Sequence, residues 1–208
     1  ADTAATTTAE SGTSAAVDPT SAPTFVELGA DPQIAEALNA DGITHAFPIQ
    51  EMCMSMALEG RDIIGQAKTG TGKTLGFGIP LLQRIDLDGD RSAPQALVIA
   101  PTRELGLQVA TDLERAGRIK GVKVLAVYGG RAYEPQIEAL QKGIDVVVGT
   151  PGRIIDLANR RDLDLSKVRV LVLDEADEML DMGFLPDVER IVALILSLIH
   201  ISEPTRPE

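Results

Sequence analysis

Residues 67–74 read AKTGTGKT, and they follow a short apolar stretch, DIIGQ, at 62–66. Gly70 and Gly72 lack a Cβ atom, so this backbone can wrap closely around phosphate oxygens with its N–H groups turned inward. A helical pattern follows at 72–85, and its positive dipole end would face the same phosphates. We therefore predict a strand, a phosphate-binding loop and a helix in that order. A glycine-rich turn that only caps a helix is the competing interpretation.

The loop ends in two residues with side chains suited to a bound triphosphate. Lys73 can reach the β- and γ-phosphates, and the Thr74 hydroxyl can ligate Mg²⁺. The general pattern for such loops carries glycine at the position of Ala67, where alanine fits without strain only if φ is negative.

A second motif supplies carboxylates about one hundred residues downstream, where 168–177 reads VRVLVLDEAD. A buried strand here delivers Asp174 and Glu175 at its carboxyl end, where open α/β sheets bind ligands. Asp174 can hold Mg²⁺ through water, and Glu175 can orient or deprotonate an attacking water. A simple acidic helix start is the alternative. Together with the phosphate loop, the motif predicts one Mg–nucleotide site.

The rest of the body alternates short apolar runs with longer amphipathic ones, which indicates strand–helix units and a parallel sheet. We predict an α/β fold, an open doubly wound parallel sheet with helices on both faces. Strands are predicted at 62–66, 96–100, 122–128, 145–149 and 168–173. Helices are predicted at 72–85, 103–118, 133–141 and 152–160, with a further helical pattern at 187–194.

Composition narrows the function classes. The chain has 208 residues, with 31 acidic and 19 basic side chains and a formal net charge of −12. This charge argues against a protein that coats nucleic acid non-specifically, because such binding relies on Lys and Arg. The longest apolar run, at 191–196, is far shorter than the ~20 residues that span a bilayer. No secretory leader pattern is present, and Cys53 alone forms no internal disulfide. We therefore expect a cytoplasmic protein without a membrane segment.

The chain has three segments that differ in amino-acid composition. Residues 1–23 are rich in Ala, Thr and Ser and are predicted to be a disordered leader. Residues 24–195 form the predicted ordered domain. Residues 196–208 contain LSLIHISEPTR, which resembles the translation of an adapter used in sequencing-library preparation, so we expect a non-native tail; an ordinary exposed tail is the alternative. The chain begins with Ala1 rather than Met, so we expect a fragment.

The motifs resemble those of the DEAD-box RNA helicases, whose name is the tetrapeptide Asp-Glu-Ala-Asp at 174–177. The resemblance also covers an isolated upstream Phe25, GITHAFPIQ at 42–50, PTREL at 101–105, the doublet Gly129-Gly130, TPGR at 150–153 and MLDMGF at 179–184. It implies the first of two RecA-like P-loop NTPase domains. In this family Ala67 is the usual residue of the loop.

The resemblance implies an ATP site with Mg²⁺. Its catalytic residues would be Lys73, Asp174 and Glu175, and its metal ligands Thr74 and Asp174, partly through water. The implied nucleotide contacts are Phe25, Ile43, Gln50, Lys68, Thr69, Gly70, Thr71, Gly72, Lys73 and Thr74. The amide of Gln50 can donate and accept at once, which suits the adenine edge. Ile43 stands where the family has an aromatic residue, and Ala46-Phe47 where it has Pro-Thr, so the adenine contacts there stay open.

The resemblance also implies a groove for the RNA backbone, without sequence specificity. The implied residues are Pro101, Thr102, Arg103, Glu104, Gly129, Gly130, Thr150, Pro151, Gly152 and Arg153. Taken alone, these segments also fit plain helix starts at strand ends. The leader carries −3 and the last 13 residues −1, which leaves −8 on the body, so any RNA groove must be a local positive strip.

The family's Ser-Ala-Thr motif and second RecA-like domain are not found in this sequence. With the second domain goes the arginine finger, typically worth about 10³–10⁵ in rate. We therefore expect this polypeptide to bind ATP–Mg²⁺ weakly, to turn over little and to unwind nothing. In the parent protein, ATP hydrolysis would drive local unwinding of RNA duplexes. A stand-alone ATP- and RNA-binding module without catalysis, and a DNA-acting helicase of the same superfamily, are the alternatives.

Overall fold

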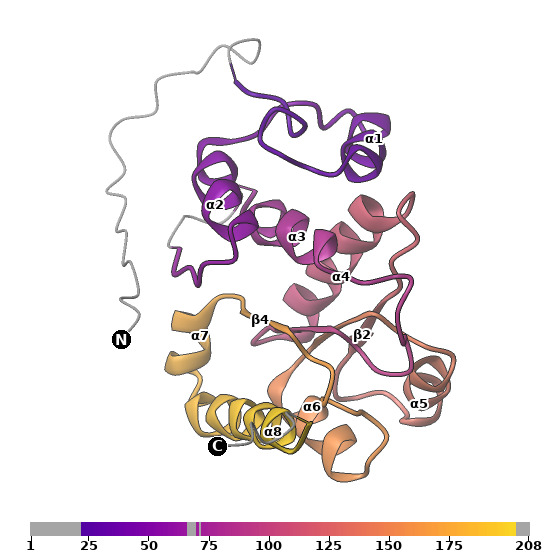
Figure 1. Cartoon of the computed structure of the whole chain (residues 1–208). Coiled ribbons are helices and arrows are strands. Elements are labelled where there is room, and N and C mark those ends of the chain that lie inside the picture. Colours follow the sequence, from indigo (N-terminus) through magenta and orange to yellow (C-terminus); the bar gives the residue numbers. More distant parts are fainter. Residues whose placement is uncertain (1–21, 66–69, 71, 203–208) are drawn as a thin grey trace, which may run out of the picture. The chain divides into compact units, whose positions relative to one another are not determined.

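The computed structural model describes residues 22–65, 70 and 72–202, with side chains through 197. The chain divides into two compact units, one within 1–84 and 115–120, the other within 85–114 and 121–208 (Figure 1). The predicted leader at 1–23 lies almost wholly outside the described residues. Across the described part of the chain, no helix is long and apolar enough to cross a membrane.

The first unit is helical. Its helices are α1 (Pro32–Ala40), α2 (Pro48–Leu58) and α3 (Lys73–Gln83). Proline at the first helical position starts both α1 and α2, where its missing N–H costs no hydrogen bond. The Asp31 carboxylate caps α1 by accepting the Gln33 N–H at 2.9 Å. Helices α2 and α3 pack against each other.

The second unit holds a four-stranded parallel sheet in the order β2-β3-β1-β4. The elements in chain order from β1 on are β1 (Ala96–Ile99), α4 (Arg103–Gly117, whose residues 115–117 belong to the first unit), β2 (Val124–Val127), α5 (Glu134–Gln141), β3 (Val146–Gly149), α6 (Pro151–Asn159), β4 (Val170–Leu173), α7 (Ala176–Asp181) and α8 (Leu185–Ser202). The predicted open α/β sheet is thereby confirmed, and β1 and β3 are fully buried, as their unbroken apolar sequences predict.

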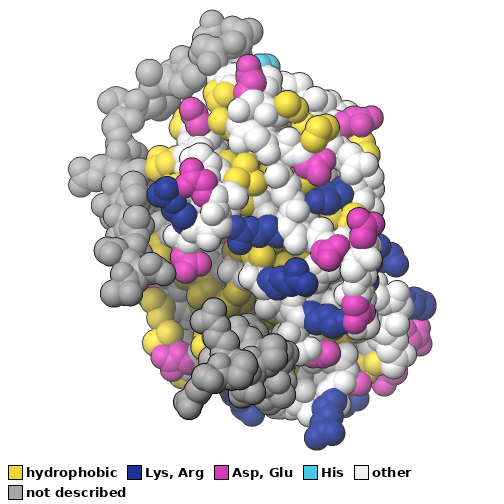
Figure 2. All heavy atoms as spheres, in the orientation of Figure 1, with side chains coloured by type: hydrophobic (Ala, Val, Ile, Leu, Met, Phe, Trp, Pro, Cys, Tyr) yellow, Lys and Arg dark blue, Asp and Glu magenta, His cyan; other side chains and the backbone are white. Residues whose placement is uncertain are grey.

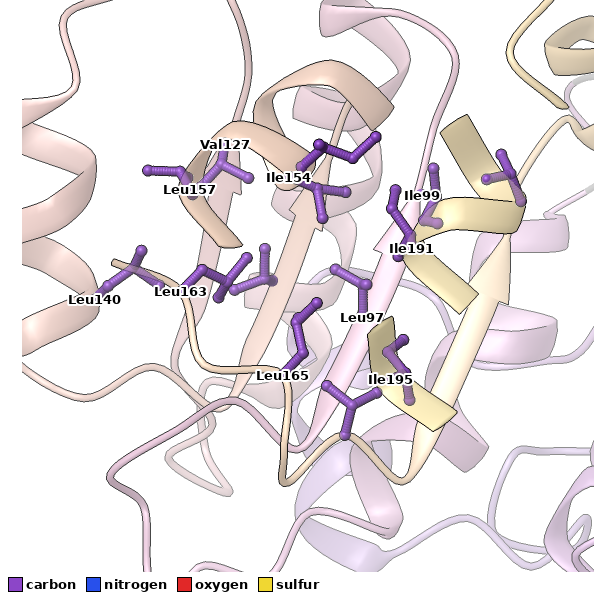
Figure 3. Close-up of a cluster of buried hydrophobic side chains, with 14 of the residues drawn as sticks. Leu97, Ile99, Val127, Leu140, Ile154, Leu157, Leu163, Leu165, Ile191 and Ile195 are labelled. Carbon is purple, nitrogen blue, oxygen red and sulfur yellow. The ribbon is translucent and has the colours of Figure 1, made fainter. Parts of the chain in front are cut away.

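Helices cover both faces of this sheet. Leu97 and Ile99 of β1 point toward α6 and α8, which lie next to each other, and into the cluster drawn in Figure 3. On the other face, Gly106 of α4 lies against Val148. Gly149 permits the close approach of α6, because a Cβ there would lie 2.8 Å from Cγ1 of Ile154.

The predicted strand at 62–66 is not formed over the described residues 62–65, and this prediction was wrong. A parallel strand takes its hydrogen bonds from neighbouring strands, and the described sheet gives this segment none. The side chain of Ile64 is accordingly 70% exposed.

Two features concern the sheet edge and the chain end. Among the described residues, β4 pairs only with β1, and Leu173 at its end is 41% exposed. Helix α8 runs through the boundary predicted at 195 and ends at Ser202. Residues 203–208 of the predicted tail lie outside the described chain.

Candidate functional site

Part of the predicted phosphate site lies in the first unit, at the start of α3. Lys73 is the first residue of this helix, and Gly72 caps it with φ 77° and ψ 24°. A Cβ at Gly72 would lie 2.3 Å from the Gln50 amide nitrogen and 2.9 Å from the Phe47 ring. Only glycine fits here, because the backbone is left-handed and the space is filled. Lys68, Thr69 and Thr71 lie outside the described residues.

Gln50 joins α2 to this loop. Its side chain is buried, with 1% exposed. The amide oxygen accepts the Phe47 N–H at 2.9 Å, and the amide nitrogen donates to the Gly72 carbonyl at 2.9 Å. The structure thus places Gln50 against Gly72 of the predicted phosphate loop, and its contact with adenine stays a prediction.

The aromatic residues near this half of the site differ in exposure. Phe25 is 1% exposed and packs in the core of the first unit, whereas Phe47 is 56% exposed. Ile43 is half-buried. The sequence marked Phe47 only as a departure from the family pattern, yet it is the exposed aromatic beside Gly72.

The acidic motif lies in the second unit, between β4 and α7. The Asp174 N–H donates to the Ile99 carbonyl at 2.9 Å, which extends the sheet ladder one residue beyond β4. Glu175 follows in a left-handed conformation, with φ 52° and ψ 51°, and caps α7. Such a backbone is uncommon for a residue other than glycine, costs about 1–3 kcal/mol and concentrates at functional sites.

The sheet register brings the predicted RNA and acidic motifs of the second unit to one rim. Ile99 aligns with Gly149 and with Leu173, and Gly149 aligns with Val127. The segments that follow these four strand ends therefore emerge together at the carboxyl edge, where α/β sheets bind ligands. They begin with Ala100-Pro101, Tyr128-Gly129, Thr150-Pro151 and Asp174-Glu175.

Four arginines contact two tyrosine rings in the segments that follow β1, β2 and β3, and we call these six residues the arginine–tyrosine row. The guanidinium carbons of Arg103 and Arg131 lie 4.9 and 5.8 Å from the Tyr128 ring centre. Those of Arg153 and Arg160 lie 4.0 and 4.6 Å from the ring centre of Tyr133. Cation–π contacts of this kind are attractive within about 6 Å. The row consists of Arg103, Tyr128, Arg131, Arg153, Tyr133 and Arg160.

Hydrogen bonds tie the row to the loop that follows β2. Arg153 donates through Nη2 to the Arg131 carbonyl at 3.0 Å, and Gln136 donates to the carbonyls of Tyr128 and Ala132 at 3.4 and 3.3 Å. Arg153 Nη1 and Gln136 Oε1 are buried without a hydrogen-bond partner among the described residues. At the neighbouring motif, the Thr102 hydroxyl accepts the Leu105 N–H at 3.2 Å.

Sequence reasoning missed four members of the row, Tyr128, Arg131, Tyr133 and Arg160. The available signal was the presence of arginine and tyrosine on either side of the Gly129-Gly130 doublet. It carries weight only once the register brings the loop after β2 beside α6.

The two halves of the predicted nucleotide site belong to different units. That Lys73, Thr74, Asp174 and Glu175 share one Mg²⁺ therefore stays a prediction. In the described chain, no group of three His, Cys, Asp or Glu side chains is arranged to hold a metal. The available donors, one hydroxyl and one strand-end carboxylate, suit Mg²⁺, which keeps several waters and takes other ligands from substrate phosphates.

Comparisons with known proteins agree with these motifs. The family model described as "DEAD/DEAH box helicase" matches residues 47–205. The DEAD-box ATP-dependent RNA helicase CshA of Streptococcus pneumoniae is 52% identical over 171 residues, which are 82% of this chain and 32% of the relative. The ATP-dependent RNA helicase DeaD of Escherichia coli is 53% identical over 175 residues, 83% of this chain and 27% of the relative.

A solved structure is similar as well. The crystal structure of a DEAD box protein from the hyperthermophile Methanococcus jannaschii superposes with a TM-score of 0.77 at 41% identity, covering 82% of this chain and 46% of that one. Of the curated relatives CshA and DeaD, by contrast, the chain spans about a third of the length.

Proposed function

Since this chain belongs to the DEAD/DEAH box helicase family, we propose that it is the ATP- and RNA-binding part of an ATP-dependent RNA helicase. The proposal is carried by the sheet register, which gathers the segments after β1, β2, β3 and β4 at one rim. Its relatives CshA and DeaD are named as ATP-dependent RNA helicases.

For the nucleotide, we propose that the start of α3 and the end of β4 bind one ATP–Mg²⁺. Lys73 places its ammonium against the β- and γ-phosphates, and the glycine-rich loop adds backbone donors. Thr74 and Asp174 would hold Mg²⁺, and a metal held there would neutralise charge on the transferred phosphoryl group. Glu175 orients or deprotonates the attacking water. Gln50 reads the adenine, and its bond to the Gly72 carbonyl supports a link between base and phosphate recognition.

For RNA, we propose that the same rim of the second unit binds the sugar–phosphate backbone. Thr102 and Thr150 offer hydroxyls, Arg103 offers charge, and Gly129 and Gly130 allow close approach of the backbone. Both glycines are exposed, and a Cβ on either would meet nothing within 4 Å. A site of this kind reads the backbone and not the base sequence, so RNA affinity should fall steeply with salt.

The parent protein would add a second domain that completes both sites. On that account, ATP binding closes the two domains on single-stranded RNA, and closure separates short duplexes locally. The 208 residues alone would bind both ligands weakly. Robust RNA-stimulated ATP hydrolysis by this chain alone would contradict the need for a second domain.

A calorimetric titration with ATP, in Mg²⁺ and in EDTA, tests whether the two halves share a metal. We expect Lys73→Ala to weaken ATP binding about 10–100-fold in both conditions, because a charged hydrogen bond contributes about 1.5–3 kcal/mol. Asp174→Asn should remove only the part of the affinity that depends on Mg²⁺. Lys142→Ala, at an exposed cation after α5, is the control. If Asp174→Asn leaves the Mg²⁺ dependence intact, the shared site is refuted.

A further inference from the structure

Two arginines next to the Gly129-Gly130 doublet differ in exposure. Arg131 is exposed, whereas Arg153 is 7% exposed, with its guanidinium carbon 4.0 Å from the Tyr133 ring centre. A guanidinium buried beneath a ring and bonded to a backbone carbonyl is poorly placed to meet a phosphate in solvent. Of the two, Arg131 is the one that an RNA backbone can reach.

We propose that Arg131 binds an RNA phosphate and that the buried Arg153 is the positioning residue for the loop that carries Arg131. The proposal rests on the RNA function proposed above. It adds Arg131 to the interface and assigns Arg153, which the family resemblance places among the RNA contacts, to the support beneath it.

The loop needs such a support. Two consecutive glycines give residues 128–132 wide conformational freedom, and fixing that freedom costs free energy on binding. Three backbone carbonyls of this short segment accept hydrogen bonds from buried side chains. Arg153 donates to one of them and Gln136 to the other two. The Tyr133 ring in turn fixes the Arg153 guanidinium, and the Tyr133 hydroxyl is anchored at 3.1 Å to the Asp156 carboxylate.

The charges of the row point to a polyanion. Arg103 and Arg131 both lie within 6 Å of the Tyr128 ring centre, so two exposed positive charges share one ring on a chain of net charge −12. Like charges held together are unfavourable unless an anion lies beside them. On the face drawn in Figure 2, Lys and Arg side chains lie among acidic ones.

Two buried polar atoms belong to the same two side chains. Arg153 Nη1 and Gln136 Oε1 are a donor and an acceptor without a hydrogen-bond partner among the described residues. Buried polar atoms are normally hydrogen-bonded to protein or to ordered water, so each of these two atoms can take one further partner.

Salt titrations of RNA binding test the role of Arg131. The probe is a labelled single-stranded oligouridylate, followed by fluorescence anisotropy with the 208-residue chain. Arg131→Gln should weaken binding and lower the slope of log affinity against log salt by about 0.7, the value for one lost phosphate contact on a single strand. Arg169→Gln removes the same charge at the opposite strand end, just before β4, and should change neither quantity.

Arg153→Lys tests the positioning role. Lysine keeps the charge but lacks the planar guanidinium that stacks on Tyr133 and donates to the Arg131 carbonyl. If Arg153 only positions the loop, Arg153→Lys should weaken RNA binding, shift the NMR amide signals of Gly129 and Gly130 without RNA, and add nothing to Arg131→Gln. Tyr133→Leu should shift the same two signals. Near-normal RNA binding and unmoved glycine signals in Arg153→Lys would overturn the positioning role.

The outcomes separate the two proposals. RNA binding by the unaltered chain, together with an Arg131→Gln variant that matches Arg169→Gln, overturns this inference and leaves the proposed function standing. Failure of the unaltered chain to bind RNA at low salt overturns both.

Discussion

Replacing Asp145 with alanine should be among the most damaging single changes in the second unit. The Asp145 side chain is fully buried at the start of β3 and forms a salt bridge with Arg91, whose Nε and Nη2 donate at 2.8 and 2.5 Å. It also accepts the Lys123 N–H at 2.7 Å. The hydrogen bonds to Asp145 raise the pKa of Arg91. Without Asp145 the arginine still stays charged, because a guanidinium is not deprotonated in proteins.

Asp145→Ala removes charge-assisted hydrogen bonds, which contribute about 1.5–3 kcal/mol, while the side chain of Arg91, which is 31% exposed, can return to water. At roughly 2–4 °C per kcal/mol for a chain of this size, Asp145→Ala should lower Tm by roughly 3–12 °C. The measurement is thermal unfolding by circular dichroism. The control is Asp181→Ala, which removes an exposed carboxylate in the same unit and should shift stability by less than about 0.5 kcal/mol.

A double variant separates the pair from its surroundings. Asp145→Ala combined with Arg91→Ala should cost less than the sum of the two single changes, because each single change already removes the same ion pair. If Asp145→Ala and Asp181→Ala have the same Tm, the ion pair between Arg91 and Asp145 does not stabilise the attachment of the Arg91 segment to β3, and this reasoning fails.

Three further changes have defined outcomes. Gly149→Ala should destabilise the chain by about 1–3 kcal/mol in urea titrations, because the new Cβ would lie 2.6 Å from Val127. The hydrogen bond from Lys167 lowers the pKa of Asp90 from 3.8 to about 2, so this carboxylate stabilises the fold above pH 3.8 and loses that effect as the pH falls toward 2. In a plot of Tm against pH, Asp90→Asn should therefore reduce the fall in Tm within that window. The difference from the unaltered chain should be smaller at high salt. Phe47→Ala should weaken ATP binding by about 1–3 kcal/mol if the ring stacks on adenine, and leave the calorimetric affinity for tripolyphosphate unchanged.

The sheet could be predicted where the sequence alone reflects burial. The runs at 96–99 and 146–149 are unbroken and apolar because both faces of these strands are covered, and both form strands. The run at 62–66, DIIGQ, has only two consecutive apolar side chains and forms no strand over 62–65. Pairing also depends on a neighbouring strand that the run's own sequence does not encode.

The candidate site divides in the same way. The motif residues could be named because phosphate and metal chemistry restricts residue types at short spacing. The Gln50 bond to Gly72 could not, since it depends on how α2 packs against α3. The Tyr133 stack on Arg153 likewise joins α6 to the residue before α5, two segments that only the folded unit brings together.

The outer side of β4 has a consequence for handling this polypeptide. Among the described residues its backbone has a ladder partner on one side only, and its sequence, VLVL, favours extended structure. A bare strand flank of this kind is a template for a second molecule, and charge repulsion at −12 opposes such pairing only until salt screens it. At high protein and salt concentration, the chain should therefore associate through the free edge of β4. Pairing that edge with an added strand should prevent this association.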